Sequence, residues 1–309
     1  MNFFSHGLGR LSLAGILVLF LTGCGSEPPM KDKAPIQISI VDDRGQVIDF
    51  SDPPKRAITL SPSLTEVLYA LDLEPCIAGV SQFSRFPVSV KEKPVVGGGL
   101  NPSLEAMLAL EPDLILHSGT SLPPVLQRME NLGIPVAALS QNTIRDLLED
   151  IQVIARIFGV QENGEALIND LQSQRNRLNS RIAELKLDSK PSVLVLFDPG
   201  SLLTAGGPSY VTEVIELAGG LNPVGMLEQP WPMLSAEGLI AYDPDVILFT
   251  DNSGGETSNL QQFKSDKRWS GLKAVKEDRL FLIDDQYLNV PGPRLIQGAS
   301  KIADLIHSD

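Results

Sequence analysis

Two acidic side chains occupy matching places in a segment that the chain carries twice. Residues 103–116 read SLEAMLALEPDLIL and residues 235–248 read SAEGLIAYDPDVIL, so seven of fourteen positions are identical at an offset of 132 without a gap. Each copy predicts a helix with a glutamate, Glu105 or Glu237, two residues after its first serine, then Pro-Asp and a buried strand. A carboxylate in the first helical turn interacts favourably with the helix dipole and so stabilises the helix. Two such carboxylates could also bind cationic groups on a partner protein. The residue types alone leave both roles open.

Histidine is too scarce for a catalytic or metal site. Of three histidines, His6 lies in an expected signal segment and His307 stands near the C-terminus. A zinc centre needs three or four clustered ligands, and a Ser-His-Asp arrangement needs an interior histidine. We therefore predict a chain that catalyses nothing and holds no resident metal or cofactor. His117 follows a predicted strand at its carboxyl end, where open α/β sheets bind ligands, and we expect a hydrogen-bonded residue of a ligand site rather than a cap on an iron or cobalt centre.

The N-terminal segment predicts export and a lipid anchor. Residues 11–21 are apolar but too few to span a bilayer, which needs about twenty residues. They are followed by Thr22, Gly23 and Cys24, and the sequence LTGC resembles the bacterial lipobox, in which the cysteine is lipidated. We expect residues 1–23 to be a signal peptide and residues 24–35 a tether; an ordinary signal peptide that contains a cysteine is the alternative. The anchor would face the periplasm or the extracellular side.

The acidic balance of the chain limits its partners. Lysine and arginine number 25 against 38 aspartates and glutamates, a net charge of −13. Such an acidic chain is not expected to bind nucleic acid or anionic membrane lipids. We therefore expect membrane attachment through the lipid anchor alone. With Cys24 lipidated, Cys76 is the remaining cysteine, which rules out an intramolecular disulfide in the mature chain.

Short apolar strands alternate with helix-length segments, the pattern of an α/β fold with largely parallel sheets. A hairpin at 36–41 and 47–49 comes first, and Ser63 and Glu66 have capping-box spacing at a helix start. The expected strands are 57–60, 77–80, 114–116, 136–139, 192–197, 246–249 and 280–283; the expected helices are 103–110, 123–132, 162–187, 210–218 and 293–306. We expect an N-terminal lobe at 36–160, a connecting helix at 161–188 and a C-terminal lobe at 189–309.

Several motifs, in order along residues 36–306, resemble the iron-complex and cobalamin periplasmic binding proteins, the substrate-binding components of ABC importers. The motifs are residues 58–66 (ITLSPSLTE), 95–105 (VVGGGLNPSLE), 111–115 (EPDLI), 230–237 (PWPMLSAE) and 291–294 (PGPR). The resemblance implies two Rossmann-like lobes joined by one long α-helix, the class III periplasmic binding protein fold. It also implies a monomer whose Glu105 and Glu237 pair with arginines of the permease dimer.

The resemblance places a small-molecule metal chelate between the lobes, where aromatic faces would suit a planar macrocycle. Loops that follow the strands should line this site, and the residues expected there are Phe83, Arg85, Phe86, Gly99, His117, Trp231, Gln286 and Tyr287. The resemblance matches Phe83, Trp231 and Tyr287 to ligand-binding positions of the cobalamin-binding members. Packing between loops is the alternative for the aromatic residues, and a surface charge for Arg85. Aromatic side chains of the cobalamin-binding members are missing at Gly99 and Ser118, and no arginine lies at 286–290. Cobalamin or another corrinoid is favoured over a ferric siderophore or haem, and a non-transport lipoprotein is a remote alternative.

Overall fold

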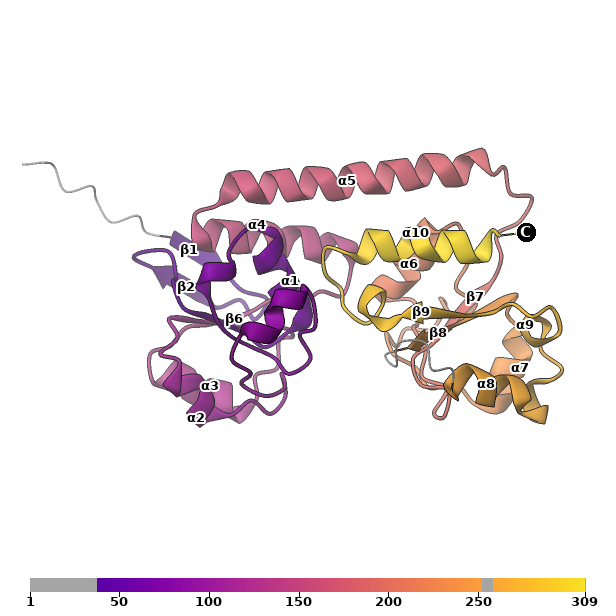
Figure 1. The fold of residues 1–309 in the computed structure, drawn as a ribbon, viewed down its shortest axis with the longest axis horizontal. Helices are drawn as coiled ribbons and strands as arrows, with labels where there is room; N and C mark the ends of the chain where they lie inside the picture. The colour runs from indigo at the N-terminus through magenta and orange to yellow at the C-terminus, as the bar shows by residue number, and fades with distance from the viewer. Residues whose placement is uncertain (1–37, 252–257, 309) are drawn as a thin grey trace, which may run out of the picture. The chain divides into compact units, whose positions relative to one another are not determined.

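The computed structural model describes residues 38–251 and 258–308, all within the compact unit Pro35–Asp309 (Figure 1). The expected signal peptide, Cys24 and the tether lie outside the described residues. None of the helices in the described part is long and apolar enough to cross a membrane.

The N-terminal half forms a parallel sheet and a small hairpin. Strands β1 (Ile38–Val41) and β2 (Val47–Phe50) pair antiparallel, as expected. The sheet has the strand order β4-β3-β5-β6. Its strands are β3 (Ala57–Thr59), β4 (Ile77–Val80), β5 (Leu114–His117) and β6 (Val136–Ala138), and its helices are α1 (Pro62–Ala70), α2 (Leu104–Ala109), α3 (Pro124–Asn131) and α4 (Ile144–Phe158), with 3-10 turns at Glu74–Cys76 and Val88–Glu92.

The C-terminal half forms a second, separate parallel sheet in the order β7-β8-β9. Its first strand, VLVL, is buried at every position, which is typical of a strand covered by helices on both faces. The strands are β7 (Val193–Leu196), β8 (Val246–Asp251) and β9 (Leu280–Asp284), and the helices are α6 (Tyr210–Leu217), α7 (Ala236–Tyr242), α8 (Ser258–Ser265), α9 (Lys273–Lys276) and α10 (Leu295–Ile306), with 3-10 turns at Lys267–Trp269 and Asp285–Tyr287.

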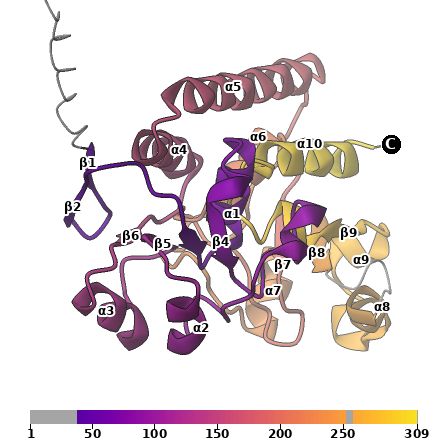
Figure 2. The same ribbon diagram turned by 60° about the vertical axis from the view of Figure 1, so that its left-hand side comes forward.

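A long helix, α5 (Gln161–Glu184), lies along one side of both sheets (Figures 1 and 2). Its 24 residues make it about 36 Å long. It packs against α4 of the first half and against α6 and α10 of the second. The largest core cluster accordingly takes side chains from both halves of the chain, among them Leu64, Ile154, Leu171, Val214 and Ile302.

Two further core clusters lie one in each lobe. One contains Met107 of α2, and the other contains Leu239 of α7, both fully buried. The two lobes therefore share a central core along α5, and each has a core of its own beneath α2 or α7.

The expected capping box at Ser63 and Glu66 is wrong. Helix α1 begins at Pro62 after Ser61, and no side chain caps it. Ser63 instead donates to the side chain of Gln141 at 2.6 Å, and Glu66 binds Arg294 from the other lobe. The spacing is that of a capping box, but both side chains are buried against distant parts of the chain.

Helix α4 was not foreseen from the sequence, although its ends carry clear signals. Thr143 and Asp146 form a capping box at its start, and Gly159 ends it in the left-handed conformation with φ of 69°. This helix is the part of the N-terminal half against which α5 packs.

Candidate functional site

The repeated segments fold into equivalent helices. Ser103 accepts a hydrogen bond from the backbone N–H of Ala106 (3.2 Å), and Ser235 accepts one from Gly238 (3.0 Å). Glu105 and Glu237 therefore stand in the first turns of α2 and α7, and both are exposed. Figures 1 and 2 both show α2 and α7 on the side of the sheets opposite α5.

The aspartate of each Pro-Asp pair binds the residues just before the neighbouring strand. The Asp113 carboxylate accepts from the backbone N–H groups of Lys55 (2.7 Å) and Arg56 (2.9 Å), just before β3. The Asp245 carboxylate accepts from the backbone N–H (2.7 Å) and hydroxyl (2.8 Å) of Ser192, just before β7. Burial acts to raise the pKa of Asp245, but hydrogen bonds from Lys273 and Ser192 outweigh it and hold that pKa below its ordinary value.

Two ion pairs connect the lobes. Arg294 donates two hydrogen bonds to the Glu66 carboxylate, at 2.5 and 3.0 Å, and Arg85 pairs with Asp285. The Glu66 and Arg294 side chains expose only 3% and 12% of their surface. Burial raises the pKa of Glu66, and the contact with Arg294 acts against that rise. Each pair joins the N-terminal to the C-terminal half of the chain.

Four of the predicted ligand residues gather around these pairs. The Arg294 guanidinium lies 3.9 Å from the ring centroid of Phe86 and 5.4 Å from that of Tyr287. The Gln286 amide, turned so that its oxygen faces Arg85, accepts two hydrogen bonds from that guanidinium at 2.9 and 3.1 Å. The structure thus brings Arg85 and Phe86 of one lobe together with Gln286 and Tyr287 of the other.

Phe83 and Gly99 belong to the same loop region of the N-terminal lobe. A Cβ on Gly98 would lie 3.1 Å from the Phe83 ring, so that ring lies against Gly98. A Cβ on Gly99 would lie 2.9 Å from the carbonyl oxygen of Leu60. Backbone crowding therefore accounts for a glycine at position 99, where cobalamin-binding relatives were expected to carry an aromatic residue.

Trp231 packs within the C-terminal lobe. Its ring centroid lies 5.5 Å from that of Phe197 and 5.6 Å from that of Tyr210, both in edge-on geometry. The Tyr210 hydroxyl donates to the carbonyl of Leu288 at 2.8 Å, which fixes this aromatic group beside the segment that carries Tyr287. Trp231 nevertheless keeps 43% of its surface exposed.

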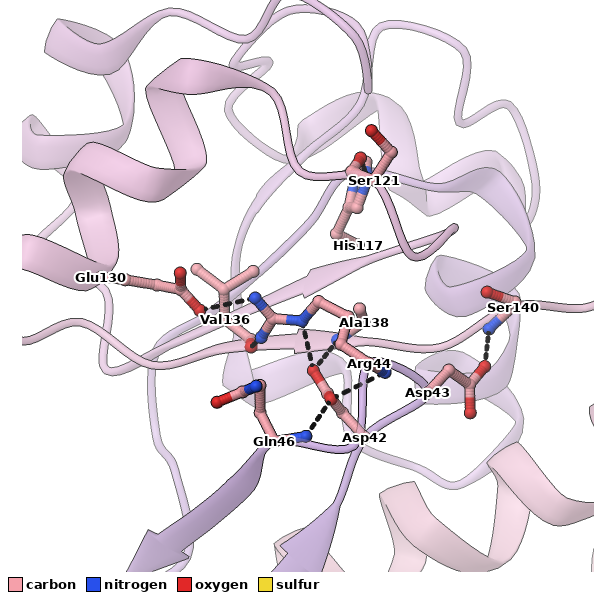
Figure 3. Close-up of polar contacts among 10 residues, drawn as sticks. All are labelled: Asp42, Asp43, Arg44, Gln46, His117, Ser121, Glu130, Val136, Ala138 and Ser140. Atoms are coloured by element: carbon pink, nitrogen blue, oxygen red, sulfur yellow. Dashed lines mark hydrogen bonds and ion pairs between the residues drawn. The ribbon is translucent and has the colours of Figure 1, made fainter.

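His117 is buried beside the network that holds the N-terminal hairpin (Figure 3). Its Nε2 lies 3.3 Å from the carbonyl oxygen of Ser121. Burial lowers the pKa of His117, the bond to Ser121 opposes this, and the charge of Arg44 lowers the pKa further. Arg44 binds Asp42 and Glu130 at 2.7 and 2.9 Å. A role for His117 in ligand binding stays a prediction.

Sequence reasoning missed the pairing roles of Glu66, Arg294 and Asp285. Glu66 and Arg294 both lie in motifs that carried the family resemblance, but 228 residues separate them and nothing local links them. Within residues 38–251 and 258–308, no group of three or more His, Cys, Asp or Glu side chains is placed to hold a metal ion.

The family model described as "Periplasmic binding protein" matches residues 58–287. The chain is 25% identical over 305 residues to an uncharacterized ABC transporter substrate-binding lipoprotein of Bacillus subtilis, covering 95% of each chain. It is 27% identical over 251 residues to a vitamin B12-binding protein of Pectobacterium carotovorum, covering 81% of this chain and 87% of that one. A periplasmic heme binding protein from Pseudomonas aeruginosa has a similar structure, with a TM-score of 0.75 and 28% identity, covering 82% of this chain and 93% of that one.

These matches confirm the predicted fold class, with two parallel α/β sheets in the class III arrangement. The matching model is that of a non-enzymatic transport component, which confirms that the chain is not an enzyme. The chain belongs to the periplasmic binding protein family.

Proposed function

We propose that this chain is the lipid-anchored substrate-binding component of an ABC importer, and that it captures a corrinoid between its lobes. Family membership supports the transport role. The names of relatives from Bacillus subtilis and Pectobacterium carotovorum support the importer and the class of ligand. Attachment would use Cys24, and Glu105 and Glu237 would dock the exposed helices α2 and α7 onto the permease dimer.

The observation that carries the ligand class is the exposed aromatic rings among the predicted ligand residues. Phe83, Phe86 and Trp231 expose 57%, 41% and 43% of their surface, so each offers part of an aromatic ring on which a flat ligand can stack. Both nearby guanidiniums are already paired, Arg294 with Glu66 and Arg85 with Asp285. Exposed rings and neutralised cations suit a planar macrocycle of low charge better than a strongly anionic ferric siderophore.

Haem is the second candidate, and one observation favours it. The Arg85 side chain remains 46% exposed although it is paired, so it could also bind a ligand carboxylate. The similar structure from Pseudomonas aeruginosa is named as a heme binding protein.

Thermal unfolding of the purified protein with cobalamin, cobinamide, haem and ferric siderophores tests the proposal. A ligand that binds only the native state stabilises it by about 2.7 kcal/mol at a hundredfold excess over Kd. We expect the melting temperature to rise with the corrinoids and the rise to shrink in Phe83→Ala and Trp231→Ala. Val47→Ala, which shortens another exposed apolar side chain on the hairpin, is the matched control. A rise with haem alone selects the second candidate, and no rise with any ligand contradicts the proposed ligand class.

The anchor and the docking need separate measurements. Radiolabelled palmitate should enter the wild type and not Cys24→Ser; labelling of the variant contradicts the anchor. Charge reversal of Glu105 and Glu237 together should abolish uptake by cells and leave binding of soluble ligand unchanged. Uptake that survives this double change contradicts the docking role.

A further inference from the structure

The outward faces of α2 and α7 expose apolar side chains at matching positions. Leu108 follows Glu105 by three residues, and Ile240 follows Glu237 by three, at the same offset of 132. Residues three apart share one face of a helix, so each glutamate has an apolar neighbour on its exposed side. Leu108 exposes 38% of its surface and Ile240 exposes 52%.

A second exposed apolar residue precedes each helix. Leu100 lies three residues before the N-cap Ser103, and Met233 lies two residues before the N-cap Ser235. Both are among the most exposed large apolar side chains in the described part of the chain, at 85% and 71%. Each docking glutamate is therefore bracketed by apolar side chains along the sequence, on both lobes.

Folding does not explain these four side chains. The inward positions of the two helices are filled by Met107 and Leu239, both fully buried in the separate core of each lobe. Single exposed apolar residues are common on proteins and need no explanation. Their recurrence beside the same glutamate in two lobes is different, because clustered apolar residues beside charges are typical of protein interfaces.

We propose that these residues form an apolar bracket, defined as Leu100 and Leu108 around Glu105 and Met233 and Ile240 around Glu237, that seats the chain on its partner. The partner is a two-fold symmetric protein surface that offers, at each of two places, a cation beside an apolar depression. The inference rests on the proposed function, which supplies the permease dimer as that surface. The glutamates set register and association rate, and burial of the bracket slows dissociation.

A second copy of this chain does not fit the same description. Contact between two copies through these helices would bring Glu105 or Glu237 of one copy close to the glutamates of the other. Each copy also carries a net charge of −13, so the two bodies repel. The bracket therefore matches a partner of opposite local charge.

The test measures binding of the lipid-anchored full chain to the permease–ATPase complex of its importer, reconstituted in nanodiscs, by biolayer interferometry at several salt concentrations. The first variant is Leu108→Ser with Ile240→Ser, and the second is Glu105→Gln with Glu237→Gln. The control is Val47→Ser with Leu185→Ser, which changes two similarly exposed residues on the hairpin and at the end of α5. Far-UV circular dichroism and binding of cobalamin confirm that each variant is folded, and Leu108→Ala with Ile240→Ala replaces the first variant if it is not.

The apolar double variant should dissociate on the order of tenfold faster, with its association rate and salt dependence unchanged. The glutamate double variant should associate more slowly and lose most of its salt dependence, and the control should match the wild type. If the wild type binds and the apolar variant dissociates at the wild-type rate, the proposed role of the apolar bracket is wrong. That result would leave docking by the glutamates uncontradicted. If the wild type does not bind, the proposed function itself fails. If the wild type is a dimer in light scattering and the apolar variant is a monomer, a second copy is the occupant and the proposal is overturned.

Discussion

The outer faces of the two lobes repeat each other, whereas the surfaces through which the lobes meet do not. On the outer side, α2 and α7 share a serine cap, an exposed glutamate and a Pro-Asp brace. Between the lobes, Glu66 and Arg85 of one half meet Arg294 and Asp285 of the other. A contact between two halves of one chain occurs once, so its two sides must be complementary rather than alike.

The difference shows how two similar lobes can have outer faces that are alike and an interface whose two sides are complementary. Features that stabilise a single lobe can be kept in both copies, because each copy has its own core beneath α2 or α7. The residues that connect the lobes must diverge in charge to attract each other. Changes at the lobe interface should therefore have large effects on stability that depend on the partner, and changes in the repeat should have small and equal ones.

Glu66→Gln should have the largest effect on stability. It leaves the buried Arg294 guanidinium without its carboxylate, and removing one partner of a buried ion pair costs about 3–5 kcal/mol. Urea unfolding at pH 7 without ligand measures the loss. Glu66→Leu with Arg294→Met should recover most of it, and Glu149→Gln, which breaks an exposed pair with Arg145, should change stability by less than about 1 kcal/mol. A loss below 1 kcal/mol for Glu66→Gln would mean that the pair does not hold the lobes together.

Asp150→Asn tests a feature of the N-terminal lobe alone. The pKa of Asp150 is raised from 3.8 to about 7: burial is the largest cause, a 2.7 Å hydrogen bond from Gln141 opposes the rise, and the charges of Asp43, Asp146 and Glu149 add to it. A raised pKa in the folded state means that stability is full below about pH 4 and is lost as the pH rises through about 7. The variant should lack this loss.

The size of that effect has an upper limit. One pKa unit corresponds to about 1.4 kcal/mol, so the gain of Asp150→Asn over the wild type at pH 8 should reach at most about 2–4 kcal/mol. Unfolding in urea at pH 4, 6 and 8 measures it. A wild type and variant whose stabilities stay parallel across this range would show that Asp150 is not protonated in the folded protein at pH 6.

Asp113→Ala and Asp245→Ala should have the smallest effects, and similar ones. Each removes a carboxylate that accepts backbone hydrogen bonds before a neighbouring strand, at about 1–2 kcal/mol. Urea unfolding of the two single variants and of the double variant gives the comparison. Costs that differ by more than twofold would show that the two braces are alike in sequence but not in energy.

The sequence predicted well those features that depend on residues close together along the chain. The strands and the helices of the two repeated segments follow from local patterns, and the structure has them where they were expected. Helix α4 was missed although Thr143, Asp146 and Gly159 mark its ends. The connecting helix ends at Glu184 rather than Leu187, because Lys186 adopts a left-handed conformation with φ of 46°.

The contacts between the lobes could not be predicted from the sequence. Glu66 sits three residues after a serine, which is the pattern of a helix cap, and only the fold shows that it is buried against Arg294. Arg85, Phe86, Gln286 and Tyr287 were expected at one site because they lie in loops after strands, and the structure brings these four residues together.

The separation of the two sheets along the chain also sets an order of events in folding. Strands β3 to β6 are complete by residue 138, long before Arg294 is made, so the first sheet can form while the second is still being synthesised. The Glu66–Arg294 contact closes over 228 residues and must therefore form late. Interactions that form after the rate-limiting step change the unfolding rate rather than the folding rate. Strengthening this pair should lengthen the lifetime of the folded protein without making it fold faster.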